Sequence, residues 1–90
     1  MQIPKLAVII PCFNEELCIE KTCNRLLEVF DILISKGKIS NESYLYLIDD
    51  GSVDNTWSII ENLHSQTPHV KAAKFIKNYG NQKALIAGLE

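Results

Sequence analysis

The stretch YLYLIDDGSVDNT (residues 44–56) decides the fold, because five apolar residues lead directly into a cluster of polar, turn-forming residues. A short apolar run that ends in this way is typical of a strand, which we place at residues 44–48. Asp54 is placed to cap a following helix, whose inner face carries Trp57, Ile60 and Leu63. Pro68 should end that helix, because the residue before a proline avoids helical geometry.

The same alternation of strand and helix precedes this stretch. Residues 6–10 are a continuous apolar run closed by Pro11, and such a run suits a parallel strand buried on both faces. Asn14 can cap the next helix, and Gly37 stands where a C-terminal cap is expected. The apolar residues between them fall on one stripe at helical spacing: Ile19, Cys23, Leu26, Leu27, Phe30, Leu33 and Ile34.

The alternation also continues after Pro68. Residues 70–76 are predicted to form a third strand, residues 78–80 a turn, and residues 81–89 a third helix. The order βαβαβα predicts an α/β fold, a parallel sheet with helices packed on it and right-handed crossovers. A complete domain of 90 residues would leave such a sheet poorly covered. We therefore expect an N-terminal part of a longer protein.

Composition and charge exclude several classes of protein. The chain has 90 residues, of which 47% are apolar and 22% charged, as in an ordinary folded domain. A net charge of -2 argues against a broad nucleic-acid-binding face, and no apolar run approaches the roughly 18 residues of a membrane span. Residues 68–90 are nevertheless basic, which suits an anionic ligand such as a phosphate. For Lys71 and Lys74 we prefer a solvated strand edge.

Cys12, Cys18 and Cys23 lie at spacings of six and five residues, which fit neither a disulfide framework nor a metal knuckle. We expect reduced thiols. A catalytic role for Cys12 is weakly supported, because no histidine lies near it in the sequence. His64 and His69 flank a predicted helix end, where we expect solvated side chains.

Three polar loops follow the three predicted strands, at residues 11–15, 49–54 and 77–82. Ligands of open parallel sheets bind beyond the carboxyl ends of the strands, so these loops are the predicted site. Asp49 and Asp50 should point to opposite sides. One would bond neighbouring amides in an Asx-turn, for which Asp49 is the better candidate. The other, Asp50, would accept hydrogen bonds from a ribose or a base, each contributing about 1.5–3 kcal/mol.

The first and third loops supply complementary groups. Phe13 offers a ring on which a nucleobase could pack, while Glu15 either accepts hydrogen bonds from a ligand or interacts with a helix dipole. Gly80 permits close approach of a phosphate at a helix start, near Lys77 and Lys83. Neither G-x-G-x-x-G nor a P-loop occurs, and Ser52 does not lie in a nucleophile elbow.

Three segments together resemble the family 2 glycosyltransferases of the GT-A fold: VIIPCFNEE (residues 8–16), LIDDGSVDNT (residues 47–56) and KNYGNQKALIAGL (residues 77–89). The third is similar to the block of the dolichol-phosphate mannosyltransferase and bactoprenol glucosyltransferase branch. The resemblance implies that residues 1–90 are the N-terminal, nucleotide-sugar-binding part of such a domain, the βαβαβα half of the GT-A fold.

The resemblance also implies a function. It is the transfer of a sugar, with inversion, from a UDP- or GDP-sugar to a lipid-phosphate or saccharide acceptor, in the first place a polyprenyl phosphate. It implies Mg²⁺ or Mn²⁺ held by ligands beyond residue 90, no catalytic residue within the chain, and membrane association on the cytoplasmic side through other segments. The residues that it places at the donor are Pro11, Phe13, Glu15, Ile48, Asp50, Lys77, Gly80 and Gln82.

Two departures from the family pattern matter. Phe13 stands where Tyr is common, and Lys77 stands where Arg is common, so a forked contact at that position is lost. Two other classes stay open. A signalling receiver domain would carry its acidic pair after the first strand, whereas here the pair follows the second. A non-catalytic piece would associate through its open sheet edge as a homo-oligomer.

Overall fold

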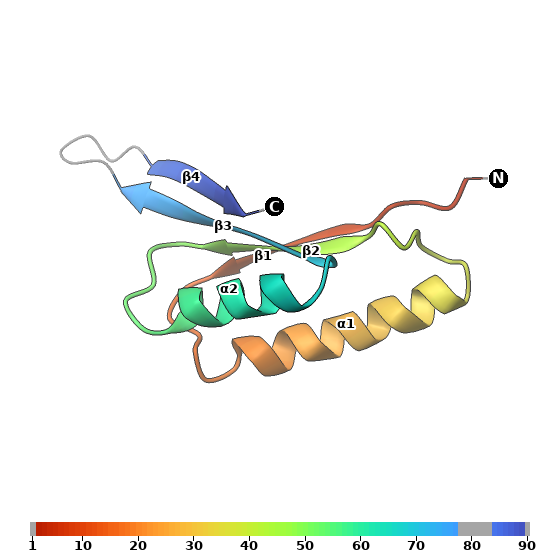
Figure 1. Cartoon of the computed structure of the whole chain (residues 1–90), viewed down its shortest axis with the longest axis horizontal. Helices are drawn as coiled ribbons and strands as arrows, with labels where there is room; N and C mark the ends of the chain where they lie inside the picture. The colour runs from red at the N-terminus through yellow and green to blue at the C-terminus, as the bar shows by residue number, and fades with distance from the viewer. Residues whose placement is uncertain (1, 78–83, 90) are drawn as a thin grey trace.

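The computed structural model describes residues 2–77 and 84–89. Its elements, in chain order, are β1 (Ala7–Cys12), α1 (Ile19–Ser35), β2 (Tyr44–Asp49), α2 (Thr56–Gln66), β3 (Val70–Lys77) and β4 (Ala84–Leu89). They form one sheet of order β1-β2-β3-β4, in which β1, β2 and β3 are parallel and β4 is antiparallel to β3. Figure 1 shows α1 and α2 beneath one face of the sheet.

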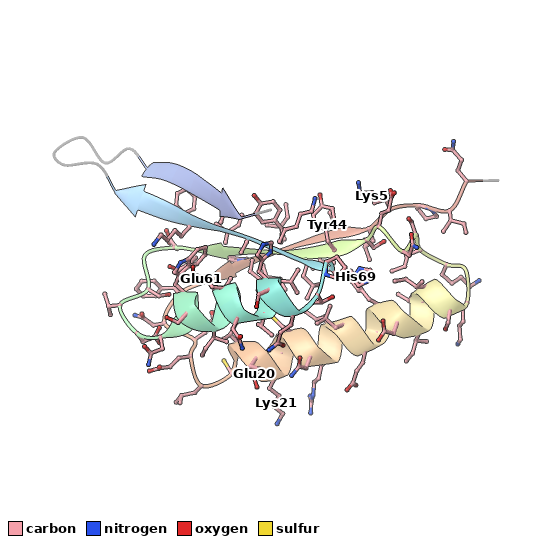
Figure 2. The ribbon with its side chains drawn as sticks, in the orientation of Figure 1. Lys5, Glu20, Lys21, Tyr44, Glu61 and His69 are labelled. Atoms are coloured by element: carbon pink, nitrogen blue, oxygen red, sulfur yellow. The ribbon has the colours of Figure 1, made fainter. Side chains whose placement is uncertain are left out.

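Both helices lie on the same face because both crossovers are expected to be right-handed and both step in the same direction along the sheet. The core lies between this face and the helices, and it includes Cys23 and Phe30 of α1, Leu45 and Leu47 of β2 and Ile60 of α2. The opposite face is not covered by any described helix. Figure 2 shows Tyr44 and Lys5 on that side.

The prediction that the first strand is buried on both faces is therefore wrong. Exposed and covered residues alternate along β1, and the side chain of Ile9 is 65% exposed. The apolar run does not distinguish the two cases, because the same run of apolar residues is compatible with a strand covered on one face and with a strand covered on both.

The apolar stripe predicted for the first helix is confirmed. Ile19, Cys23 and Phe30 are buried, and the other four residues of the stripe pack against the core. The C-terminal cap is also confirmed. Gly37 has a positive φ of 69° and donates to the carbonyl of Ile34, and the next amide, that of Lys38, donates to the carbonyl of Leu33. This pair of bonds satisfies carbonyls that the helix end leaves free.

Asn14, in contrast, does not cap α1. The helix begins at Ile19, five residues after Asn14, and its N-cap position is Cys18, which makes no side-chain cap bond. Asn14 has a φ of 50°, in the left-handed region that asparagine tolerates better than most residues. Residues 15–18 form a separate turn in which the carbonyl of Glu15 accepts hydrogen bonds from the amides of Cys18 and Ile19.

The predicted end of the second helix is confirmed, whereas its N-cap position is Asn55 rather than Asp54 and makes no side-chain cap bond. The carboxylate of Asp54 accepts a hydrogen bond of 2.9 Å from the amide of Thr56, the first residue of α2. The helix ends at Gln66, and Thr67 before Pro68 is extended, with φ -150° and ψ 141°. The proline therefore acts through the geometry that it imposes on its predecessor.

The third predicted helix is wrong, because residues 84–89 form strand β4. A short apolar segment fits a buried strand or a helix equally well, and Gly88 weakens a helix by about 1 kcal/mol. The edge of β3 offers unpaired backbone groups, which β4 satisfies from Lys77↔Ala84 to Ala72↔Leu89. The turn predicted at 78–80 lies outside the described residues.

The two histidines are also placed differently from the prediction. Both are half-buried, and one ring nitrogen of each bonds a backbone carbonyl at 2.8 Å, Val70 for His64 and Ser43 for His69. They tie the end of α2 and the start of β3 to neighbouring backbone. Their role is structural.

Replacing Phe30 by Ala should lower the free energy of unfolding by about 3–5 kcal/mol, because the ring is 2% exposed and its loss leaves a cavity. Ile32→Ala on the same helix should cost less than about 1 kcal/mol, since Ile32 is 53% exposed. Urea unfolding followed by circular dichroism measures both. Equal losses for the two variants would contradict the assignment of the core face.

Candidate functional site

The loops after β1 and β2 leave the sheet side by side. The last residues of the two strands, Cys12 and Asp49, are partners in the parallel register. The amide of Asp50 then donates a 2.8 Å hydrogen bond to the carbonyl of Cys12. The two loops that the sequence predicts to form a site are therefore joined at their bases.

The third predicted loop begins farther out. In the register of β2 and β3, Asp49 pairs with Lys74, and β3 continues for three more residues to Lys77. Of the residues predicted in this loop, Gly80 and Gln82 lie outside the described residues. For Lys77 only the backbone is described, at the end of β3.

Asp49 and Asp50 divide their roles as the sequence predicts. Asp49 is 2% exposed, and its carboxylate accepts hydrogen bonds from the hydroxyl of Ser52 and, at 3.2 Å, from the Ser52 amide. It therefore closes the turn. Asp50 is exposed, so its carboxylate is free to accept hydrogen bonds from a ligand. That use of Asp50 stays a prediction.

Other predicted site residues surround this point. Pro11 and Ile48 are partners in the register, and the alternation of burial places both on the uncovered face of the sheet. Phe13 is 56% exposed, while Glu15 is half-buried. The structure thus brings Pro11, Phe13, Glu15, Ile48 and Asp50 to one corner of the sheet.

Four side chains that are not among the predicted ligand-binding residues connect the two loops: those of Asn14, Ser52, Asp54 and Thr56. Asn14 donates its amide hydrogen to the Ser52 hydroxyl oxygen at 2.8 Å, and its side-chain oxygen accepts from the amide of Val53 at 2.9 Å. The amide of Glu15 donates to the hydroxyl oxygen of Thr56 at 2.7 Å, and Asp54 accepts from the amide of the residue after Glu15 at 3.4 Å. In the sequence, the turn-forming residues of segments 8–16 and 47–56 indicate loops, but they do not indicate hydrogen bonds between the two loops.

Two of the three thiols are protected by burial. Desolvation by burial, together with the nearby carboxylate of Glu15, raises the pKa of Cys12 to about 12 and that of Cys23 to about 11. At neutral pH these thiols are protonated, and the thiol is a poor nucleophile compared with the thiolate. Cys12 is therefore unsuited to catalysis. Cys18 is exposed, and all three thiols are free.

In the native protein, a thiol reagent such as Ellman's reagent should label one of these three cysteines at neutral pH, because only Cys18 is exposed. In denaturant all three should react. Cys18→Ser should abolish rapid native labelling at these positions, whereas Cys23→Ser should leave it unchanged. Rapid labelling that persists in Cys18→Ser would contradict the burial of the other two thiols, and peptide mapping identifies the modified residue.

Asp54 has a pKa below the ordinary value of 3.8. Desolvation acts in the opposite direction and raises the pKa, but hydrogen bonds outweigh it. The donors are the hydroxyl and the amide of Thr56 and the amide of Glu16. Because the folded state prefers the carboxylate, this group stabilises the fold fully above its unfolded pKa, and the contribution is lost as pH falls through the lower folded-state pKa.

Asp54→Ala should lower the melting temperature by a constant amount between pH 7 and about pH 5. The difference from the wild type should shrink as pH falls below the ordinary value of 3.8, because the unfolded chain then takes up its proton before the folded carboxylate does. Glu61→Ala on α2, an exposed position, is the control and should show no such pH-dependent difference. A gap for Asp54→Ala that stays constant down to pH 3 would be the contrary outcome.

Lys71 and Lys74 do not line a solvated edge, so that prediction is wrong. The pairing of β3 with β4 makes β3 an inner strand. The ammonium of Lys71 lies 4.3 Å from the centroid of the Tyr44 ring, and that of Lys74 lies 5.2 Å from the Trp57 ring. Each lysine is half-buried against an aromatic face, a favourable cation–π arrangement.

Across residues 2–77 and 84–89, no three His, Cys, Asp or Glu side chains converge to hold a metal ion. Within the same described part of the chain, neither helix combines the length and the apolar character needed to cross a bilayer.

Three parallel strands with two helices, and polar loops at the carboxyl ends of β1 and β2, are the features of an open α/β sheet, in which ligands bind beyond the carboxyl ends of the strands. Comparison with known families makes this specific. Residues 7–90 match the model of glycosyl transferase family 2. The chain therefore belongs to the family 2 glycosyltransferases, and its three parallel strands and two helices correspond to the N-terminal half of the GT-A fold.

Curated relatives agree with this assignment. The uncharacterized glycosyltransferase YkoT of Bacillus subtilis is 42% identical over 96% of this chain and 26% of its own length. An undecaprenyl-phosphate 4-deoxy-4-formamido-L-arabinose transferase of Shewanella sediminis is 37% identical, over 94% of the chain and 24% of that protein. A prophage bactoprenol glucosyl transferase homolog of Escherichia coli is 35% identical, over 96% and 26%. The chain spans about a quarter of the length of these relatives.

Proposed function

We propose that the complete protein transfers a sugar from a nucleotide-diphospho-sugar, and that the corner formed by the β1 and β2 loops holds the nucleoside part of this donor. The observation that carries the proposal is the hydrogen bond from Asp50 to the carbonyl of Cys12. This bond keeps the exposed carboxylate of Asp50 beside the residue that precedes Phe13. A hydrogen-bond acceptor and an aromatic ring thus belong to two loops that are joined at their bases, at the carboxyl end of the sheet.

Each group has a distinct task in this proposal. The carboxylate of Asp50 accepts hydrogen bonds from ribose hydroxyls or from a base N–H. The ring of Phe13 provides the surface on which the base packs, and Pro11 and Ile48 form the apolar floor beneath it. Glu15 lies at the rim as a second acceptor.

We further propose a polyprenyl phosphate as the acceptor. Two of the relatives described above carry undecaprenyl phosphate or bactoprenol in their names, and this supports membrane association of the complete protein and a place in lipid-linked sugar or cell-wall synthesis. In the reaction, a phosphate oxygen of the acceptor would form a bond to the anomeric carbon. The bond from that carbon to the diphosphate oxygen would break with inversion, and its electron pair would leave with the nucleoside diphosphate. A phosphate oxygen that is already ionised needs no base.

We also propose that a divalent cation, Mg²⁺ or Mn²⁺, binds the diphosphate of the donor. The described residues contain no cluster of three or more His, Cys, Asp or Glu side chains that could hold a metal ion, and the steps above are assigned to the residues of this chain and to the two substrates.

Asp50→Asn in the complete protein should weaken UDP or GDP binding about 10- to 100-fold, the equivalent of one charge-assisted hydrogen bond of about 1.5–3 kcal/mol. Isothermal titration calorimetry measures this change. The matched control is Asp31→Asn, the same substitution at an exposed position in the middle of α1, which should bind as the wild type does. Equal affinity of Asp50→Asn and the wild type would refute the assigned role.

A further inference from the structure

The loops after β1 and β2 are joined by hydrogen bonds that run in both directions. Asn14 uses its amide as a donor to Ser52 and its side-chain oxygen as an acceptor from Val53, at 2.8 and 2.9 Å. These two bonds connect residues almost forty positions apart in the sequence. We call the Asn14–Ser52–Val53 group the loop clasp.

The buried carboxylate of Asp49 orients the Ser52 hydroxyl of the loop clasp. The hydroxyl of Ser52 donates its hydrogen to the carboxylate of Asp49, which is buried at the end of β2. A hydroxyl that donates to a carboxylate keeps its oxygen lone pairs for another donor, and here that donor is the amide of Asn14. The buried carboxylate therefore orients the acceptor of the clasp.

A second hydroxyl, that of Thr56, joins the same two loops in the same way as the hydroxyl of Ser52. The hydroxyl of Thr56 donates to Asp54 and accepts from the amide of Glu15 at 2.7 Å. The carboxylate of Glu16 accepts from the amide of Asn55 at 3.3 Å. Because both sets join the same two loops, the loops form one rigid unit rather than two independent ones.

The loop clasp is adjacent in the sequence to the two groups to which the proposed function assigns the nucleoside. Phe13 directly precedes Asn14, and Asp50 lies two residues before Ser52. The φ of 50° at Asn14 sets the direction in which the chain turns after Phe13. A change in the clasp therefore changes the position of the ring relative to the carboxylate, while both groups remain present.

We propose that Asn14 and Ser52 are positioning residues, which hold the ring of Phe13 and the carboxylate of Asp50 at the one separation that a nucleoside diphosphate can bridge. The inference rests on the proposed function and deepens it. Neither residue needs to touch the ligand, since both act through the loops that they join. Binding energy from two groups adds fully only when both can reach the ligand in the same pose.

Asn14→Gly is the informative variant, because glycine keeps the positive φ without strain and removes only the side-chain acceptor. In the complete protein we expect Asn14→Gly to weaken binding of UDP or GDP by about tenfold. Asn14→Asp keeps an oxygen acceptor and also tolerates this φ, so it should bind within about threefold of the wild type. Ser52→Ala and Ser52→Thr form a second pair, without and with the hydroxyl.

The decisive readout is non-additivity with Asp50→Asn, measured by calorimetry at a temperature where circular dichroism shows every variant folded. If the clasp positions Asp50, then the loss of affinity caused by Asp50→Asn should be about tenfold smaller in the Asn14→Gly background than in the wild type, which equals the cost of Asn14→Gly alone. A residue that only stabilises the fold would leave that factor unchanged. If Asn14→Gly does not fold, the same cycle is measured with Ser52→Ala.

The outcomes separate the two proposals. Wild-type protein that binds neither UDP nor GDP would overturn the proposed function and this inference with it. Wild-type protein that binds, with an effect of Asp50→Asn that is the same in both backgrounds, would overturn the positioning role alone. Unchanged affinity in Asn14→Gly would do the same.

Discussion

The structure depends on the register between the first two strands. Cys12 and Asp49 are partners at the ends of β1 and β2, so both chains leave the sheet at the same level, and the amide of Asp50 reaches the carbonyl of Cys12. A shift by one residue would turn every side chain of a strand to the other face and would bring the buried carboxylate of Asp49 out of its turn. The core on the helix-covered face makes such a shift costly.

Much of this fold could be predicted from the sequence. Spacing at helical period identified the buried stripe of α1, and turn chemistry identified the cap at Gly37 and the division between Asp49 and Asp50. These features are local or follow from one periodicity. The strand at 84–89 was missed because its pairing with β3 is a tertiary contact that a six-residue apolar segment does not encode.

The candidate site was predictable in its location and not in its construction. Polar loops after apolar strands indicate the carboxyl edge of a parallel sheet. Asparagine favours the N-cap of a helix, which predicts a cap at Asn14, but its backbone and its side chain bond the neighbouring loop instead. Sequence patterns describe partners three or four residues apart, whereas these partners are separated by 38 and 39 positions.

The candidate site has two parts. The hydrogen-bonded loops fix the backbone, and the side chains of Phe13 and Asp50 take no part in those bonds. The bonds between the loops use backbone amides together with Asn14, Ser52, Asp54 and Thr56, and they use neither the ring of Phe13 nor the carboxylate of Asp50. An engineer could therefore vary positions 13 and 50 in a library while the backbone beneath them keeps its shape. Such a corner would allow preference for one base over another to be altered without rebuilding the scaffold.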